Sequence, residues 1–253
     1  MKVYAIANFK GGTGKTTTAV NLAAMLARDG QRVLLIDADA QHNATNFFIL
    51  GTEGGITLTD VLEGLGETVW EDNISPSGRE RLWLLPADMG LLSLDLSAIL
   101  HGTTAGFRRF QDFLDAMGQD GEIDSVVIDC PPSFTAASVA ALANADELIL
   151  PTRVDDNSRR GVLELLEQVE SLPRTATPAR CRILVTMADR SNVSKQGEEL
   201  LRAGRVEVFK TVIRRGIAVD EATYARQPLY EYKPKCAPAL DYEAFLGEVL
   251  ADG

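Results

Sequence analysis

Short apolar runs recur along the whole chain and are separated by segments of mixed polarity. Runs without a regular polar alternation predict strands that are buried on both faces, as in a parallel sheet. These runs cover residues 2–8, 32–36, 82–86, 125–129, 148–151, 182–187 and 206–213. The polar residues that follow several of the runs are therefore expected at the ends of strands.

The segments between the runs carry apolar residues at helical spacing. Between Ala19 and Leu26, for example, alanine and leucine recur at every third or fourth position, and Gly30 ends the pattern. Helices are also expected over residues 57–62, 88–117 (with a break near 102–104), 159–171, 194–203, 217–226 and 238–251. Residues 74–78 are rich in serine, proline and glycine and predict a loop.

Strands that alternate with helices predict an α/β fold. The sheet should be doubly wound and mostly parallel, with helices on its flanks, because each crossover between parallel strands needs room for a helix. No repeat or domain-sized linker interrupts the pattern, so we expect residues 1–253 to form a single domain.

A glycine-rich stretch lies between the first strand and the first helix. It reads Lys10-Gly11-Gly12-Thr13-Gly14-Lys15-Thr16-Thr17. The glycines let consecutive backbone N–H groups point at one anion, and the new helix adds its positive N-terminal end. We therefore predict a phosphate site, in which Lys15 contacts the outer phosphates and the Thr16 hydroxyl binds Mg²⁺. The ordinary phosphate-loop pattern would place a glycine at position 9, but this chain has Phe9 there and an additional lysine, Lys10, after it.

Three acidic residues follow strands of the predicted sheet. Asp37 and Asp39 come directly after the second apolar run and would share one face if the chain stayed extended. Asp129 ends the run at 125–129. Ligands of open parallel sheets bind at the carboxyl ends of the strands. We therefore expect all three carboxylates beside the phosphate loop.

The composition limits the classes of protein and the cellular locations that need to be considered. Hydrophobic residues make up 45% of the chain and charged residues 24%, which is ordinary for a globular protein. No apolar run is long enough to span a membrane. The first strand follows Met1 almost at once, so no signal peptide is expected. Three widely spaced cysteines predict neither a disulfide framework nor a zinc site, and a cytoplasmic location is expected.

The net charge of −11 argues against nucleic-acid binding by the surface as a whole. One segment differs from this average. Residues 205–235 contain seven basic and four acidic residues, which gives a net charge of +3 (7 − 4). This segment is either a solvated surface or a local site for an anionic polymer.

These motifs resemble the ParA/MinD family of P-loop ATPases with a deviant Walker A loop, and its ParA/Soj branch in particular. The resemblance lies in residues 10–18, 33–45 and 126–133. It implies a Mg²⁺-dependent ATPase that converts ATP to ADP and phosphate, slowly alone and faster with a partner. Two residues depart from the family pattern, since Ala40 replaces a proline and His42 replaces a glycine. His42 is either close to the phosphates or an exposed loop residue.

The resemblance also implies roles for individual residues. Nucleotide contacts would come from Lys10, Gly11, Gly12, Thr13, Gly14, Lys15, Thr16, Thr17 and Met187. Lys10 would reach across a dimer to the partner's nucleotide, and Asp39 would position the attacking water. Asp37 and Asp129 would hold the Mg²⁺ shell together with Thr16. Lys10, Lys15 and Asp39 are thus the predicted catalytic residues.

Members of this family form ATP-dependent homodimers that bind DNA without sequence preference. They partition plasmids or chromosomes with a ParB-like or other centromere-binding protein, which implies nucleoid association in the ATP-bound state. Candidate DNA contacts are Arg190, Arg214, Arg215 and Arg226, whereas Ala218 stands where the family has an arginine.

Two alternative functions remain open at this point. The chain could position a protein cargo on the nucleoid by the same mechanism, or it could be a MinD-like ATPase recruited to a membrane. The second role needs a basic amphipathic C-terminal helix. Residues 242–253 are instead acidic, and an anionic membrane would repel them. No membrane partner is therefore expected.

Overall fold

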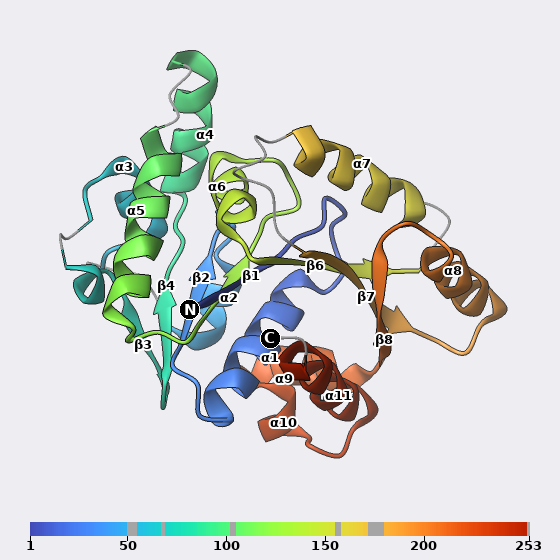
Figure 1. Cartoon of the computed structure of the whole chain (residues 1–253). Coiled ribbons are helices and arrows are strands. Elements are labelled where there is room, and N and C mark those ends of the chain that lie inside the picture. The colour runs from blue at the N-terminus through green and yellow to red at the C-terminus, as the bar shows by residue number, and fades with distance from the viewer. Residues whose placement is uncertain (50–54, 67–68, 102–104, 155–157, 172–179, 252–253) are drawn as a thin grey trace.

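A computed structural model of the chain describes residues 1–49, 55–66, 69–101, 105–154, 158–171 and 180–251. One eight-stranded sheet with the order β3-β4-β2-β5-β1-β6-β7-β8 forms its centre (Figure 1). The strands are β1 (Lys2–Ile6), β2 (Val33–Asp37), β3 (Ser75–Arg79), β4 (Leu82–Leu85), β5 (Ser125–Asp129), β6 (Glu147–Arg153), β7 (Arg180–Ala188) and β8 (Glu207–Arg214). All neighbouring pairs are parallel except β3 and β4. The expected α/β fold with a mostly parallel sheet is confirmed.

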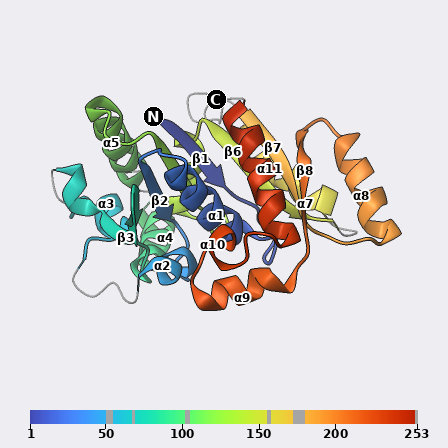
Figure 2. The same ribbon diagram turned by 90° about the horizontal axis from the view of Figure 1, so that it is seen from below.

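Helices cover both faces of the sheet (Figures 1 and 2). They are α1 (Lys15–Arg28), α2 (Asn43–Phe48), α3 (Leu58–Glu63), the 3₁₀ turn η1 (Trp70–Asn73), α4 (Gly90–His101), α5 (Ala105–Asp120), α6 (Ala136–Asn144), α7 (Ser158–Ser171), α8 (Asn192–Arg202), α9 (Ile217–Ala225), α10 (Leu229–Tyr232) and α11 (Ala237–Ala251). Helices α3, α5, α6 and α7 pack on one face, and α1, α2, α9, α10 and α11 pack on the other.

The alternation of side chains along β1 explains why this strand is apolar throughout. Val3 and Ala5 join the core under α5 and α6, whereas Tyr4 and Ile6 join the core under α1 and α11. All four side chains are buried. A central parallel strand has two covered faces, so every position along it favours an apolar residue.

The loop predicted over residues 74–78 is wrong, because this segment forms most of strand β3. The strand lies at the edge of the sheet and pairs only with β4, in antiparallel register with an irregularity between Pro76 and Arg79. Proline is tolerated on an edge strand because one side of it needs no ladder hydrogen bonds. The Ser77 hydroxyl donates a hydrogen bond to the Leu82 carbonyl (2.6 Å) and helps to hold the pair together.

Other differences concern short elements. Helices α2, α6 and α10 and the turn η1 were not expected from the sequence, whereas the remaining helices lie where the helical spacing predicts them. Helices α4 and α5 occupy the segment predicted as helical over 88–117, and the predicted break at 102–104 lies outside the described residues. Among the helices that the structure describes, none is both long and apolar enough to cross a membrane.

The strand order of the sheet creates a place for a ligand at the carboxyl ends of its parallel strands. Strand β1 lies between β5 and β6, so the chain leaves β1 toward β2 on one side and continues from β6 to β7 and β8 on the other. Such a reversal opens a crevice beyond the carboxyl ends of the strands, where α/β proteins bind ligands. The glycine-rich loop after β1 lies at this crevice.

Candidate nucleotide site

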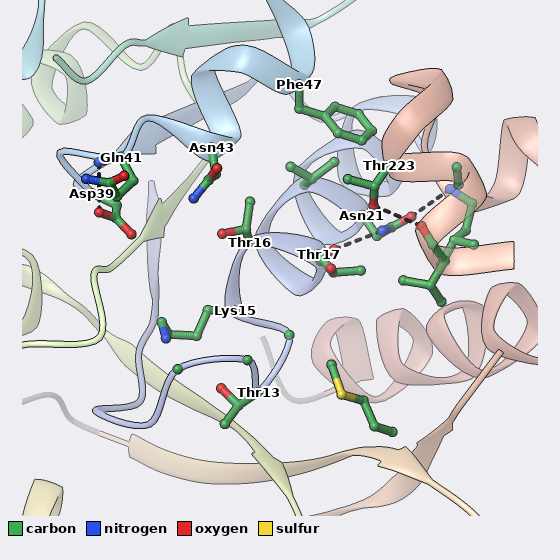
Figure 3. Close-up of a pocket in the computed structure, with 18 of the residues that line it drawn as sticks. Thr13, Lys15, Thr16, Thr17, Asn21, Asp39, Gln41, Asn43, Phe47 and Thr223 are labelled. Atoms are coloured by element: carbon green, nitrogen blue, oxygen red, sulfur yellow. Dashed lines mark hydrogen bonds between the residues drawn. The ribbon is translucent and has the colours of Figure 1, made fainter. Parts of the chain in front are cut away.

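The glycine-rich loop connects β1 to α1 and lines a cavity of about 500 Å³ (Figure 3). Gly12 and Gly14 have left-handed backbone conformations (φ 69° and 88°), which non-glycine residues rarely adopt. Gly14 is also the residue that precedes α1. Residues Gly11 to Thr17 all contribute to the wall of the cavity, so the backbone N–H groups of the loop and the positive end of α1 converge there.

Two buried side chains hold the loop against neighbouring strands. Asn8 donates a hydrogen bond to the Pro151 carbonyl at β6 (2.9 Å) and accepts one from the backbone N–H of Lys10 (2.9 Å). The Thr186 hydroxyl of β7 donates to the Thr13 carbonyl (2.7 Å). Sequence patterns gave no sign of either role, because the bonds to Pro151 and from Thr186 join segments more than a hundred residues apart.

Lys15 is largely buried at the start of α1, and its ammonium group donates a hydrogen bond to the Lys10 carbonyl (3.2 Å). Burial lowers its pKa, while the carboxylates of Asp129 and Asp39 act in the opposite direction. Removal of a charged group from water is costly unless an opposite charge lies close. The position of Lys15 therefore favours an anionic ligand in the cavity.

Asp37 and Asp129 end the adjacent strands β2 and β5 and are paired in register. Asp37 is completely buried and accepts hydrogen bonds from the backbone N–H of Asp39 (3.1 Å) and from the N–H and hydroxyl of Thr45 (2.7 and 2.8 Å). Burial raises the pKa of Asp37 to about 6, although the bonds from Thr45 favour the ionised form. Asp37 thus joins the end of β2 to the beginning of α2.

Asp129 has a different environment. It is 1% exposed, and neither of its carboxylate oxygens makes a hydrogen bond to any described group. Burial and the proximity of Asp37 raise its pKa well above the usual range, whereas the Thr16 hydroxyl and Lys15 lie near enough to act in the opposite direction. A buried carboxylate without a partner is unfavourable. A divalent cation would supply the missing partner.

The donor set fits Mg²⁺ better than a transition metal. No group of three or more histidine, cysteine, aspartate or glutamate side chains forms a metal cluster among the described residues. Mg²⁺ prefers oxygen ligands and commonly takes one or two carboxylates, a hydroxyl, waters and substrate phosphates. The Asp129 carboxylate and the Thr16 hydroxyl match this pattern, and Asp37 lies beside Asp129 in register.

Asp39 lies on the opposite side of the cavity from Thr13, on the connection between β2 and α2 (Figure 3). Its carboxylate accepts a hydrogen bond from the backbone N–H of Gln41 (3.0 Å), and its carbonyl accepts one from His42 N–H (2.7 Å). Met187 lies at the end of β7 beside Gly14 and also lines the cavity, as does Pro132 after β5. The loop, the acid and the predicted nucleotide-contacting methionine therefore surround one space.

His42 does not line this cavity. Its ring nitrogen Nδ1 lies 3.1 Å from the carbonyl of Ala40, within its own loop. The residue has a left-handed backbone conformation (φ 44°), which a glycine would adopt without strain. His42 is half-buried, so it is neither part of the cavity wall nor the exposed loop residue of the alternative expectation.

Three of the four candidate DNA-binding arginines lie together, around a second cavity of about 990 Å³ next to the base of the glycine loop. Arg190, Arg214 and Arg215 line this cavity and are exposed. The Arg214 guanidinium is bonded to the carboxylate of Asp241 (2.6 Å), so its charge is partly offset. Arg226 is exposed at the other end of α9, away from this group.

The fold and the loop define the class of protein, a P-loop nucleotide-binding protein. The sequence profile of the family described as "AAA domain" matches residues 1–180. The chain is 36% identical to the chromosome partitioning protein ParA of Caulobacter vibrioides (strain NA1000 / CB15N), over 99% of this chain and 94% of that protein. It is also 36% identical to the chromosome-partitioning ATPase Soj of Thermus thermophilus, over 98% and 94% of the two chains.

A comparison with solved structures agrees at the level of the fold. An ATP complex of a McdA variant from Cyanothece superposes with a TM-score of 0.85 at 24% identity, over 99% of this chain and 96% of that chain. The chain belongs to the ParA/Soj branch of the ParA/MinD family of P-loop proteins. The resemblance inferred from the loop and the acidic motifs is therefore confirmed.

Proposed function

We propose that this chain is a Mg²⁺-dependent ATPase that acts as a molecular switch in DNA partitioning, built as a single P-loop ATPase domain over residues 1–253. The observation that carries the proposal is the convergence of Lys15 and Asp39 on one cavity, with the unpartnered carboxylate of Asp129 beside Lys15. The similarity over the full chain to a relative named as an ATPase supports the same activity.

The loop would bind the phosphates of ATP or ADP. Backbone N–H groups from Gly11 to Gly14 and the N-terminal end of α1 provide positive potential, and Lys15 adds a full charge for the β- and γ-phosphates. Thr13, Thr16 and Thr17 complete the phosphate side, and Met187 contacts the nucleoside. The lowered pKa of Lys15 is consistent with a site that is completed only by an anion.

Thr16 and Asp129 would hold Mg²⁺, and Asp37 would support its water shell. When bound, the ion neutralises charge on the phosphates. Asp39 would then orient the attacking water, since it lies across the cavity from the loop (Figure 3). Phosphoryl transfer depends mainly on such positioning and charge neutralisation.

Lys10 would act on the nucleotide of a second copy of the chain. A lysine supplied in trans works like an arginine finger and makes hydrolysis depend on dimerisation. The ATP-bound homodimer would bind DNA without sequence preference through Arg190 and Arg215, with smaller contributions from Arg214 and Arg226. A ParB-like or other centromere-binding partner would stimulate hydrolysis and release the dimer from the nucleoid.

The first experiment measures binding to duplex DNA with ATP, with ADP and without nucleotide, at about 50 and 200 mM salt. We expect binding with ATP alone, without sequence preference and much weaker at the higher salt. Lys15→Ala should abolish the effect of ATP. Failure of ATP to produce either a dimer or DNA binding would overturn the proposed switch.

Two arginine variants make this experiment more specific. Arg190→Ala should weaken DNA binding and lower the slope of log affinity against log salt by about one, as the loss of one phosphate contact requires. Arg214→Ala is the matched control, because Asp241 already offsets its charge, and its effect should be smaller. DNA binding that neither variant changes would contradict the assignment of these arginines. No DNA binding in any nucleotide state, with dimerisation intact, would point to a membrane or protein-only partner, which liposome sedimentation with ATP distinguishes.

A further inference from the structure

Thr45 connects three segments that surround the candidate water-positioning acid, and no role follows for it from the loop motif. It lies in α2, eight residues after Asp37, and is 1% exposed. Its backbone N–H and its hydroxyl both donate to Oδ2 of Asp37, at 2.7 and 2.8 Å. The same hydroxyl oxygen accepts a hydrogen bond from the backbone N–H of Ala87 (3.0 Å), in the connection that follows β4.

The second oxygen of Asp37 extends this network to Asp39. Oδ1 accepts the backbone N–H of Asp39 at 3.1 Å, so one carboxylate holds Thr45 with one oxygen and Asp39 with the other. The backbone N–H of Ala38 is in turn held by the Asp129 carbonyl (2.9 Å). The connection that carries Asp39 is thus fixed at its start by β5 and at its end by Thr45.

We propose that Thr45 is a positioning residue for Asp39, acting through the Asp37 carboxylate; this inference rests on the proposed ATPase function. The Thr45 hydroxyl is both a donor and an acceptor, a combination that a threonine or serine can supply and a valine of similar shape cannot. Without it, Asp37 loses one of its hydrogen bonds and the buried N–H of Ala87 loses its acceptor. The Asp37 carboxylate then keeps only backbone N–H groups as donors, and it anchors the Asp39 backbone less firmly.

The expected consequence concerns the chemical step more than nucleotide binding. Thr45 does not line the cavity, and the proposed phosphate-binding groups lie on the glycine-rich loop and the first turn of α1. A small displacement of a catalytic group can lower a rate by about 100-fold. Thr45→Val should therefore lower kcat for ATP hydrolysis by about 10- to 100-fold. The KM for ATP should change by less than about threefold, because the binding groups are left in place.

The test compares three variants of the full-length chain by steady-state hydrolysis, ATP affinity and thermal unfolding. Thr45→Ser retains the hydroxyl and should keep kcat within about threefold of the wild type. Thr57→Val is the matched control for the same chemical change. Thr57 is also buried, and its hydroxyl donates to the Asp60 carboxylate (2.9 Å), but it belongs to the start of α3 and does not line the nucleotide cavity. It should lower the unfolding temperature and leave kcat unchanged.

Several results would overturn the inference. These are an unchanged kcat in Thr45→Val, a raised KM with kcat unchanged, or a loss no larger than that in Thr57→Val. If Thr45→Val does not fold, Thr45→Ser decides the question, because a tenfold loss of kcat in the variant that keeps the hydroxyl contradicts the inference. A wild-type chain that binds ATP without hydrolysing it would instead overturn the proposed function, and this inference with it.

Discussion

Asp129 is a buried carboxylate that is proposed to bind Mg²⁺. Its burial should destabilise the folded protein when no ion is bound. Its oxygens have no hydrogen-bond partner among the described groups, and Asp37 lies next to it in register. Without Mg²⁺, two carboxylates in a medium of low polarity disfavour each other's ionised form. In the proposed Mg²⁺ site, Asp129 would be a ligand and Asp37 would support the water shell. The free protein would then carry an unfavourable arrangement that the bound state relieves.

Replacement of Asp129 by asparagine should separate these two effects. We expect Asp129→Asn to lower ATP hydrolysis in saturating Mg²⁺ by at least about 100-fold, because several kcal/mol of charge stabilisation would be lost. In the absence of nucleotide and Mg²⁺, at slightly alkaline pH, the variant should unfold at a higher temperature than the wild type, since a buried charge is removed. Calorimetry and a phosphate-release assay measure the two quantities.

Glu147 provides a matched control. It is also a buried carboxylate at the sheet, but its Oε1 accepts a charged hydrogen bond from Arg182 (2.5 Å). Removal of one partner from a buried ion pair leaves the other uncompensated, which typically costs about 3–5 kcal/mol. Glu147→Gln should therefore lower the unfolding temperature. If Asp129→Asn also lowers it, or hydrolyses ATP at the wild-type rate, the assignment of Asp129 as a Mg²⁺ ligand is contradicted.

At the scale of the elements, a surface ion pair between Arg32 and Asp124 joins the amino ends of β2 and β5, opposite the strand ends that face the glycine-rich loop. Asp124 accepts hydrogen bonds from the backbone N–H of Arg32 (2.8 Å) and from its guanidinium (2.9 and 3.1 Å). In return, the Arg32 carbonyl accepts the backbone N–H of Asp124 (2.8 Å). These bonds align the first residues of the two strands, which are paired in register as Val33 and Ser125.

This pair predicts a defined pH dependence of stability. The bonds from Arg32 lower the pKa of Asp124 from 3.8 to about 2. A carboxyl group whose pKa is lower in the folded state stabilises the protein above the pKa of the unfolded state, and that stabilisation is lost as the pH falls through the folded value. Asp124→Asn should therefore reduce the free energy of unfolding near neutral pH. The difference from the wild type should shrink between pH 3.8 and about 2.

The expected size is small, because the Asp124 side chain is 42% exposed and water screens the pair. We expect less than about 1 kcal/mol in urea titrations. Glu80→Gln serves as the control, since its side chain is 90% exposed and its contact with Arg81 is long (3.7 Å). A difference between wild type and Asp124→Asn that stays constant down to the lowest pH would contradict the assignment.

Sequence patterns predicted some of the secondary-structure elements and missed others. Strands β1, β2 and β5 were predictable because both of their faces are buried, which leaves a continuous apolar run. Strand β3 was not, since Ser-Pro-Ser-Gly-Arg has no apolar residue and is extended only because it pairs with β4. Helix α6 was missed because its alanine-rich sequence has little contrast between polar and apolar faces.

The residues of the candidate site also fall into two groups, those that local sequence order predicts and those whose roles depend on tertiary contacts. Lys15 and Thr16 could be predicted from local order, because a phosphate loop has a lysine and a hydroxyl residue at a fixed spacing from its glycines. The acids could be predicted because they follow buried strands. Thr45 could not be assigned a role, since its partner Ala87 is 42 residues away in the chain. The offset of the Arg214 charge by Asp241 depends likewise on the packing of α11 against β8. Contacts of this kind arise from tertiary structure and leave no periodic pattern.

At the scale of the whole molecule, the proposed mechanism would take two of the predicted catalytic residues, Lys10 and Asp39, from different protomers of the dimer. Asp39 lies on its own chain's cavity, whereas Lys10 would serve the nucleotide of the other copy. In a twofold-symmetric dimer, each site would then contain an aspartate from one chain and a lysine from the other. This division can be tested without knowledge of the partner protein or of the DNA site.

Mixtures of two inactive variants provide the test. Lys10→Ala and Asp39→Ala should each hydrolyse ATP very slowly alone, because every site lacks one group. In a mixed dimer, the Lys10→Ala chain keeps its own Asp39 and receives Lys10 from the other chain, so one of the two sites is complete. Random exchange in an equal mixture makes half of the dimers mixed, and the rate should recover to about one quarter of the wild type. If both residues acted within one chain, the mixture would remain as slow as its components, and a phosphate-release assay distinguishes the two outcomes.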